Sequence, residues 1–167
     1  ELGEGLLHLA LAKRLIRLQW GESILTLHFG KVTMMAKLIG GSFPNYRQLI
    51  PTTTVASITV QAEDIMRALQ QVNRLASEGS GIVRLVWEKG QLLVSAHSDE
   101  ETVTVPVPAE MDGSGRVALN IGYLFSYFRE RVGAVTLGLG GEGESSPVLF
   151  SYRGVPHVLL MPMFVKW

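Results

Sequence analysis

The 167-residue chain contains no cysteine. This absence excludes disulfide bonds, thiolate metal ligands and a cysteine nucleophile, and it fits a reducing cytoplasm. The chain also lacks any apolar run of about 18 residues, so the sequence predicts no membrane span. It has no excess of charge, because 15 Lys and Arg balance 15 Asp and Glu. A role with nucleic acid would therefore need cations that are segregated on one surface.

Motifs for catalysis are missing as well. The four histidines, His8, His28, His97 and His157, show no metal-ligand spacing, and the sequence contains no HExxH, GxSxG or Walker A motif. The glycine-rich stretch 138–143 follows a predicted strand but leads to another strand, so it lacks the helix N-terminus of a phosphate loop. We therefore expect no enzyme activity, no metal and no cofactor.

What the chain does have is a repeat. Hydrophobic residues make up 47% of the sequence, which is enough to predict a folded core. Helical periodicity marks three stretches whose starts lie about 58 residues apart, at 5–15, 62–76 and 121–132. Short β-type runs fill the intervals, with glycine-containing turns between them. These strands are predicted at 16–20, 24–29, 32–39, 56–60, 82–88, 91–96, 102–107, 116–120, 135–139, 148–152 and 157–161.

The order of these elements predicts an α+β fold made of repeated β-α-β-β-β units. The unit occurs twice in full, at about 55–108 and 115–163, and once without its leading strand, at about 4–39. The two complete units would form one domain, whereas the first unit is left with an incomplete sheet. Because an uncovered sheet edge is a liability, either a longer chain or another subunit would supply the missing pairing.

Charge is distributed unevenly over the predicted elements. On the helix at 62–76, an apolar stripe that includes Ile65 and Leu69 would face the core, and the other side carries Arg67, Gln71 and Arg74. Most acids fall instead in predicted turns. Taken alone, this pattern favours ordinary solubilising charge; the alternative is a polyanion that faces the helices and is bound without sequence preference.

Two further segments carry more apolar side chains than solvated loops need. Residues 40–51 include Phe43, Tyr46 and Leu49, which would either dock on their own domain or form the wall of a binding groove. The run 157–164 is apolar and contains Pro162, which favours an edge position. Its methionines would give an adaptable contact surface.

Three of these stretches resemble one known family. Residues 37–51 read KLIGGSFPNYRQLIP and closely resemble the interdomain segment of the bacterial replicative sliding clamp, the β subunit. Residues 119–124 (LNIGYL) and 158–163 (VLLMPM) resemble that family's last helix and its C-terminal motif. The resemblance implies that 1–50 form the second half of the family's middle domain with the interdomain segment, and that 51–167 form a complete last clamp domain.

The resemblance implies a DNA-clamp fold, with helices on an inner layer and antiparallel sheets outside. It implies a processivity factor that encircles double-stranded DNA without sequence preference. Through short peptide motifs it would tether DNA polymerase and clamp-loader-type proteins, in the cytoplasm and at the bacterial nucleoid. The DNA-facing candidates are the helix residues Lys13, Arg14, Arg67, Gln71, Arg74, Arg129 and Arg131. The candidates for the partner-peptide groove are Pro44, Gln48, Leu49, Leu159, Leu160 and Met161.

The resemblance also bears on assembly. A ring of the family contains twelve half-domain units and this chain would carry three, so the hypothesis is a homo-oligomer in which four copies form a tetrameric ring. The family's TDGHRL segment, which supplies the other wall of the groove, has no counterpart in this sequence. The alternative is an interaction module that keeps the clamp fold without the ring, as a truncated or internally initiated clamp would.

Overall fold

The computed structural model describes residues 5–11, 14–98, 100–141, 146–153 and 158–167. The chain separates into two compact units, Glu1–Asn45 and Tyr46–Trp167. We call them unit 1 and unit 2, and each is described by itself.

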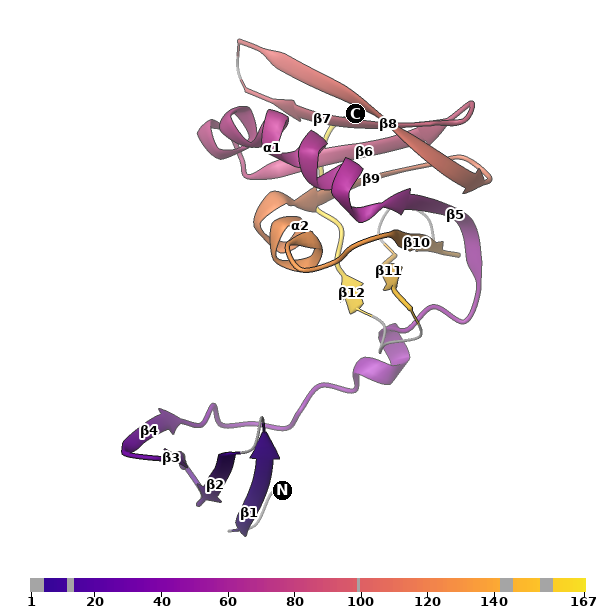
Figure 1. The fold of residues 1–167 in the computed structure, drawn as a ribbon. Coiled ribbons are helices and arrows are strands. Elements are labelled where there is room, and N and C mark those ends of the chain that lie inside the picture. The colour runs from indigo at the N-terminus through magenta and orange to yellow at the C-terminus, as the bar shows by residue number, and fades with distance from the viewer. Residues whose placement is uncertain (1–4, 12–13, 99, 142–145, 154–157) are drawn as a thin grey trace. The chain divides into compact units, whose positions relative to one another are not determined.

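Unit 1 contains a four-stranded antiparallel sheet in the order β1-β2-β3-β4 (Figure 1). Its strands are β1 (Gly5–Leu11), β2 (Arg14–Trp20), β3 (Ile24–Phe29) and β4 (Val32–Lys37). The expected helix at 5–15 is wrong, since β1 and β2 occupy that stretch. Unit 1 is therefore not a β-α-β-β-β unit that has lost its first strand.

The physical reason lies in the leucine pattern of β1. Leu7, Leu9 and Leu11 alternate with period two, and Leu7 and Leu11 also have the i, i+4 spacing of a helical face, so this short apolar run cannot be assigned by periodicity alone. Long-range pairing decides in favour of the strand, because Leu7 and Leu9 sit opposite Leu18 and Ile16 of β2.

The register of unit 1 gives its sheet one apolar face. Leu18 of β2 pairs with Leu27 of β3, and Leu27 pairs with Met34 of β4. Because alternate residues share a face, this face carries the following side chains. They are Ile16, Leu18, Trp20, Leu25, Leu27, Phe29, Val32, Met34 and Ala36. None of residues 16–45 is fully buried, and Met34 is 62% exposed.

Unit 2 is built on a continuous eight-stranded sheet in the order β12-β11-β10-β5-β8-β7-β6-β9. Its helices are η1 (Tyr46–Leu49), a 3-10 turn, α1 (Ala62–Glu78) and α2 (Ile121–Phe128). Its strands are β5 (Thr54–Gln61), β6 (Ile82–Glu88), β7 (Gln91–His97), β8 (Thr102–Asp112), β9 (Gly115–Asn120), β10 (Ala134–Gly140), β11 (Val148–Ser151) and β12 (Val158–Leu160). The long strand β8 joins the two halves, because residues 102–108 pair with β7 and residues 109–112 pair with β5.

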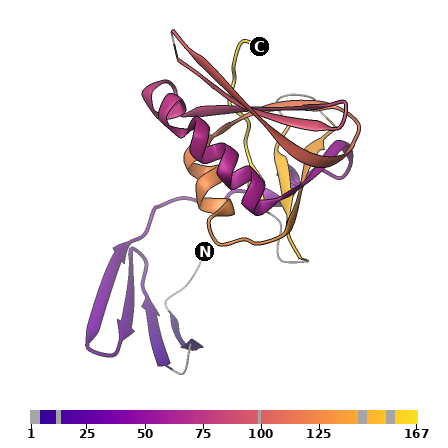
Figure 2. The ribbon, with the colours of Figure 1, turned by 45° about the horizontal axis from the view of Figure 1, so that its top comes forward.

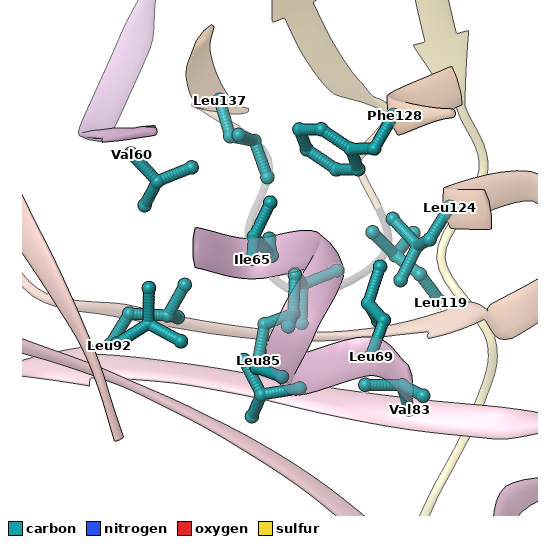
Figure 3. Packing of buried hydrophobic residues seen from close by; sticks show 14 of the residues in the cluster. Val60, Ile65, Leu69, Val83, Leu85, Leu92, Leu119, Leu124, Phe128 and Leu137 are labelled. Carbon is teal, nitrogen blue, oxygen red and sulfur yellow. The ribbon is translucent and has the colours of Figure 1, made fainter. Parts of the chain in front are cut away.

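The two helices of unit 2 lie side by side on one face of this sheet (Figures 1 and 2). Ile65 and Leu69 of α1 are fully buried between side chains from both halves of the sheet, and Leu124 of α2 packs into the same cluster (Figure 3). Burying each of these three side chains contributes about 1.5–3 kcal/mol. The predicted apolar stripe of the second helix is therefore confirmed as core.

Both complete β-α-β-β-β repeats are confirmed, as β5-α1-β6-β7-β8 and β9-α2-β10-β11-β12. The helix α2 ends at Phe128, four residues before the predicted end. It begins cleanly, because the Asn120 side chain accepts hydrogen bonds from the amides of Gly122 and Tyr123. Gly133 has a φ of +89°, which fits the turn into β10.

Candidate nucleic-acid interface and partner groove

The outward side of α1 and the end of α2 carry the predicted polyanion-binding side chains. Arg67, Gln71 and Arg74 are exposed on α1, because α1 turns its apolar stripe toward the sheet. Arg129 follows the last turn of α2 and is also exposed. The helices α1 and α2 pack against each other (Figure 2). The four residues are therefore carried by one helical layer, three on α1 and one at the end of α2. Guanidinium and amide groups arranged in this way suit phosphate contacts.

Two of these arginines have carboxylate partners. Arg67 pairs with Asp64 one turn earlier on α1. Arg74 lies 2.9 Å from Glu78 Oε2 through Nη1, and 3.2 Å from Glu101 Oε2 through Nη2. Hydrogen bonding to Glu78, with its charge, and then to Glu101 raises the pKa of the Arg74 guanidinium. Asp64 lies in the first turn of α1 and Glu78 is its last residue.

These ion pairs do not prevent the arginines from binding phosphate. All of the side chains involved are solvent-accessible, and exposed ion pairs contribute about 0–1 kcal/mol. A phosphate that approaches Arg67 or Arg74 can therefore replace the carboxylate at small cost.

None of the other three predicted candidates is an exposed residue of a described helix. Lys13 lies outside the described residues, and Arg14 begins β2 and so is not on a helix. Arg131 is half-buried, donates a hydrogen bond to the Tyr127 carbonyl, and stacks 3.8 Å from the centre of the Tyr127 ring. Burial raises the pKa of the Tyr127 hydroxyl. The helical layer therefore comes from two helices, and Arg131 packs into the domain.

A pocket of about 480 Å³ opens elsewhere on unit 2. It brings together three of the predicted groove residues, Gln48, Leu49 and Met161. Leu49 is 48% exposed and Met161 is 58% exposed, so both present apolar surface to solvent. Exposed apolar side chains that line a concavity are typical of a site for a partner or ligand.

The predicted wall, residues 40–51, also supplies Ile50 and Pro51 to the pocket. Sequence reasoning missed the rest of the lining, which is Thr52, Thr53, Gly140, Gly141, Ser146 and Pro147. The signal was the glycine pair at the end of β10. A Cβ on Gly140 would lie 3.0 Å from Pro51, and one on Gly141 would lie 3.1 Å from the Thr53 hydroxyl. These glycines let the end of β10 approach the segment 51–53 closely.

The remaining groove candidates are placed differently. Leu159 and Leu160 lie on β12 and are half-buried, and Leu160 packs against the core. Neither lines the pocket. Pro44 lies in unit 1. Among the described residues that line the pocket none is charged, and they offer apolar, hydroxyl and amide groups to a ligand.

Across the described ranges of the chain, no cluster of three or more His, Asp or Glu side chains is placed to hold a metal ion. The helices that the structure describes are also too short or too polar to cross a membrane.

Comparison with known proteins connects this geometry to one class. No protein-family model matches the chain. It is 28% identical over 112 residues to the β sliding clamp of Proteus mirabilis, covering 66% of this chain and 30% of that protein. It is 26% identical over 154 residues to the clamp of Synechococcus elongatus, covering 89% of this chain and 38% of that protein. It is 26% identical over 158 residues to the clamp of Caulobacter vibrioides, covering 90% of this chain and 41% of that protein.

Solved structures agree. The DNA polymerase III β subunit of Pseudomonas aeruginosa superimposes with a TM-score of 0.76 at 21% identity, covering 91% of this chain and 42% of that one. The Caulobacter crescentus β sliding clamp superimposes with a TM-score of 0.75 at 24% identity, covering 90% of this chain and 41% of that one. The sliding clamp of Bartonella birtlesii bound to griselimycin superimposes with a TM-score of 0.75 at 21% identity, covering 90% of this chain and 41% of that one.

The joined antiparallel sheets with paired helices on one face are therefore the DNA-clamp fold, as expected. More particularly, the chain resembles the bacterial β sliding clamp, the β subunit of DNA polymerase III. The chain spans about two fifths of the length of the Synechococcus elongatus and Caulobacter vibrioides clamps, and about the same share of the Pseudomonas aeruginosa clamp structure.

Proposed function

We propose that this chain is a clamp-type processivity factor that holds a DNA polymerase on double-stranded DNA. The observation that carries this proposal is the helical layer of unit 2, where Arg67, Gln71, Arg74 and Arg129 are exposed on a clamp fold. Such side chains contact phosphates and do not read bases, so the complex would be salt-sensitive and independent of sequence. The chain would act in the cytoplasm at replicating DNA, without catalysis of its own.

The proposal includes a homo-oligomeric ring, and the apolar face of unit 1 supports it. In unit 2 the apolar face of the sheet is covered by helices, whereas Val32 and Met34 of unit 1 remain exposed. A second copy would cover this face by an isologous contact across a two-fold axis. Because one isologous contact closes at two copies, a second contact between two such dimers would complete the tetrameric ring that encircles DNA.

Solution mass tests the ring, measured by size exclusion with light scattering over a concentration series. We expect a mass near four chains. Met34→Glu should lower the mass, because it puts a charge on the apolar face, and Met35→Glu is the control because Met35 lies on the other face of β4. A mass of one chain at all micromolar concentrations would overturn the ring and leave a clamp-fold interaction module.

We further propose that the pocket binds the apolar peptide motifs of DNA polymerase and clamp-loader-type partners. Griselimycin, the ligand named for the Bartonella birtlesii clamp, is a suitable probe. Leu49→Ala and Met161→Ala should each weaken its binding about tenfold, which is the loss expected when a large apolar contact is removed. Binding is measured by titration calorimetry.

The control for the pocket is Tyr123→Ala. Tyr123 is exposed on α2 and does not line the pocket, so it removes a large side chain without changing the site. Both pocket substitutions lie at exposed positions and should leave unfolding unchanged. Equal affinities for the wild type and for both pocket variants would remove this part of the proposal.

A further inference from the structure

The segment after β12, residues 161–167, forms no helix or strand, yet it is held at defined points of unit 2. The Met163 amide donates a hydrogen bond to the Ala118 carbonyl of β9 at 2.8 Å. Farther along, Arg84 of β6 donates through Nη2 to the Lys166 carbonyl at 2.8 Å. The segment therefore crosses β9 and reaches β6 (Figure 1).

The register places this contact on the outer face of the sheet. Val83 and Leu85 of β6 are buried in the core with the helices, so Arg84 between them faces outward. Arg84 is opposite Ala118, which therefore faces outward too. Ala118 is nevertheless only 1% exposed, and its carbonyl accepts the hydrogen bond from Met163 of the segment 161–167.

Trp167 completes the attachment. Its ring lies 5.0 Å from the Arg116 guanidinium and 5.8 Å from that of Arg84. Both distances are within the range of a cation–π interaction. Two strands, β6 and β9, thus each supply one cation to the same indole ring.

Arg84 is itself fixed in place by a third strand. Its Nη1 lies 2.6 Å from His97 Nε2, and His97 Nδ1 lies 2.8 Å from the Thr102 hydroxyl. A guanidinium can only donate, so Nε2 is the acceptor and the imidazole is neutral. Burial, and then the charge of Arg84, lowers the pKa of His97, which agrees with this assignment.

The attachment continues into the groove. Met161 lines the pocket and is followed two residues later by Met163, which is bonded to Ala118. On its other side, Met161 follows β12, which is paired with β11. The position of Met161 therefore depends on how the segment 161–167 is fastened at both ends.

We propose that Trp167, seated between Arg84 and Arg116, is a positioning residue that fixes Met161 in the wall of the groove. This inference rests on the proposed function of the pocket. Trp167 itself does not line the pocket, so it acts on binding only through the segment that carries Met161.

The test is Trp167→Ala in the full chain, with griselimycin as the probe. We expect affinity to fall about fivefold, which is the size of an exposed cation–π contact. Trp167→Phe keeps an aromatic face and should restore binding to within about twofold of the wild type. Lys166→Ala is the matched control, because it removes a neighbouring side chain and leaves the carbonyl that accepts from Arg84.

Hydrogen exchange of peptides that cover residues 158–167 gives a readout that needs no ligand. Exchange should become faster in Trp167→Ala, with no change in the peptides from α1. Unchanged exchange would overturn the anchor even if griselimycin never binds. If Trp167→Ala exchanges faster but binds griselimycin as tightly as the wild type does, the positioning role is overturned. If the wild type itself does not bind griselimycin, the result counts against the proposed function of the pocket.

Discussion

Gly115→Ala is expected to lower the free energy of unfolding of unit 2 by about 3 kcal/mol, the upper end for overpacking a core. A Cβ at this position would lie 2.5 Å from Cζ2 of Trp87 and 2.7 Å from Cδ1 of Leu139. Trp87 is fully buried within the hydrophobic cluster, so its ring has no free space into which to move. The cost would therefore fall on the packing between β9 and β6, which pair at these residues.

Urea denaturation followed by tryptophan fluorescence measures this effect. Gly40→Ala is the matched control, because a Cβ there has no heavy atom within 4 Å and Gly40 has no positive φ. The control should change stability by less than about 0.5 kcal/mol. A loss below about 1 kcal/mol for Gly115→Ala would mean that the core around Trp87 repacks more easily than close packing allows.

The sequence was sufficient for the parts of the fold where local pattern and long-range packing agree. In α1 the helical spacing of Ile65 and Leu69 coincides with the face that the sheet buries. Strands β6 and β7 alternate buried and half-buried residues and are joined by a tight turn at Lys89 and Gly90, both at positive φ. Local signals of this kind do not depend on the rest of the chain.

The first fifteen residues show why the remainder was not predictable. Leu7 and Leu11 fit a helical face, whereas Leu7 and Leu9 fit an alternating strand, and only the pairing of this stretch with β2 distinguishes the two. The candidate site has the same limit. Gln48, Leu49 and Met161 were found through a resemblance, whereas Gly140 and Pro51 meet only because β10 pairs with β5.

Charge reversal on the helical layer should have the largest effect on function. Arg67→Glu combined with Arg129→Glu removes two phosphate-binding cations, one beside each helix, and replaces them with charges that repel DNA. We expect association with duplex DNA to weaken at least about tenfold at low salt. The logarithmic salt dependence of the binding constant should become shallower by about 1.8, because each lost phosphate contact contributes about 0.9.

Fluorescence anisotropy of a labelled duplex, titrated at several salt concentrations, gives both quantities. The control is Lys31→Glu with Lys89→Glu, which changes the net charge equally but alters exposed turns at β3–β4 and β6–β7. If total charge alone attracted DNA, the two double variants would lose affinity and salt slope to the same extent. A loss confined to the Arg67 and Arg129 pair would instead mean that the cations of the helical layer meet the phosphates, because only a local contact distinguishes two proteins of equal charge.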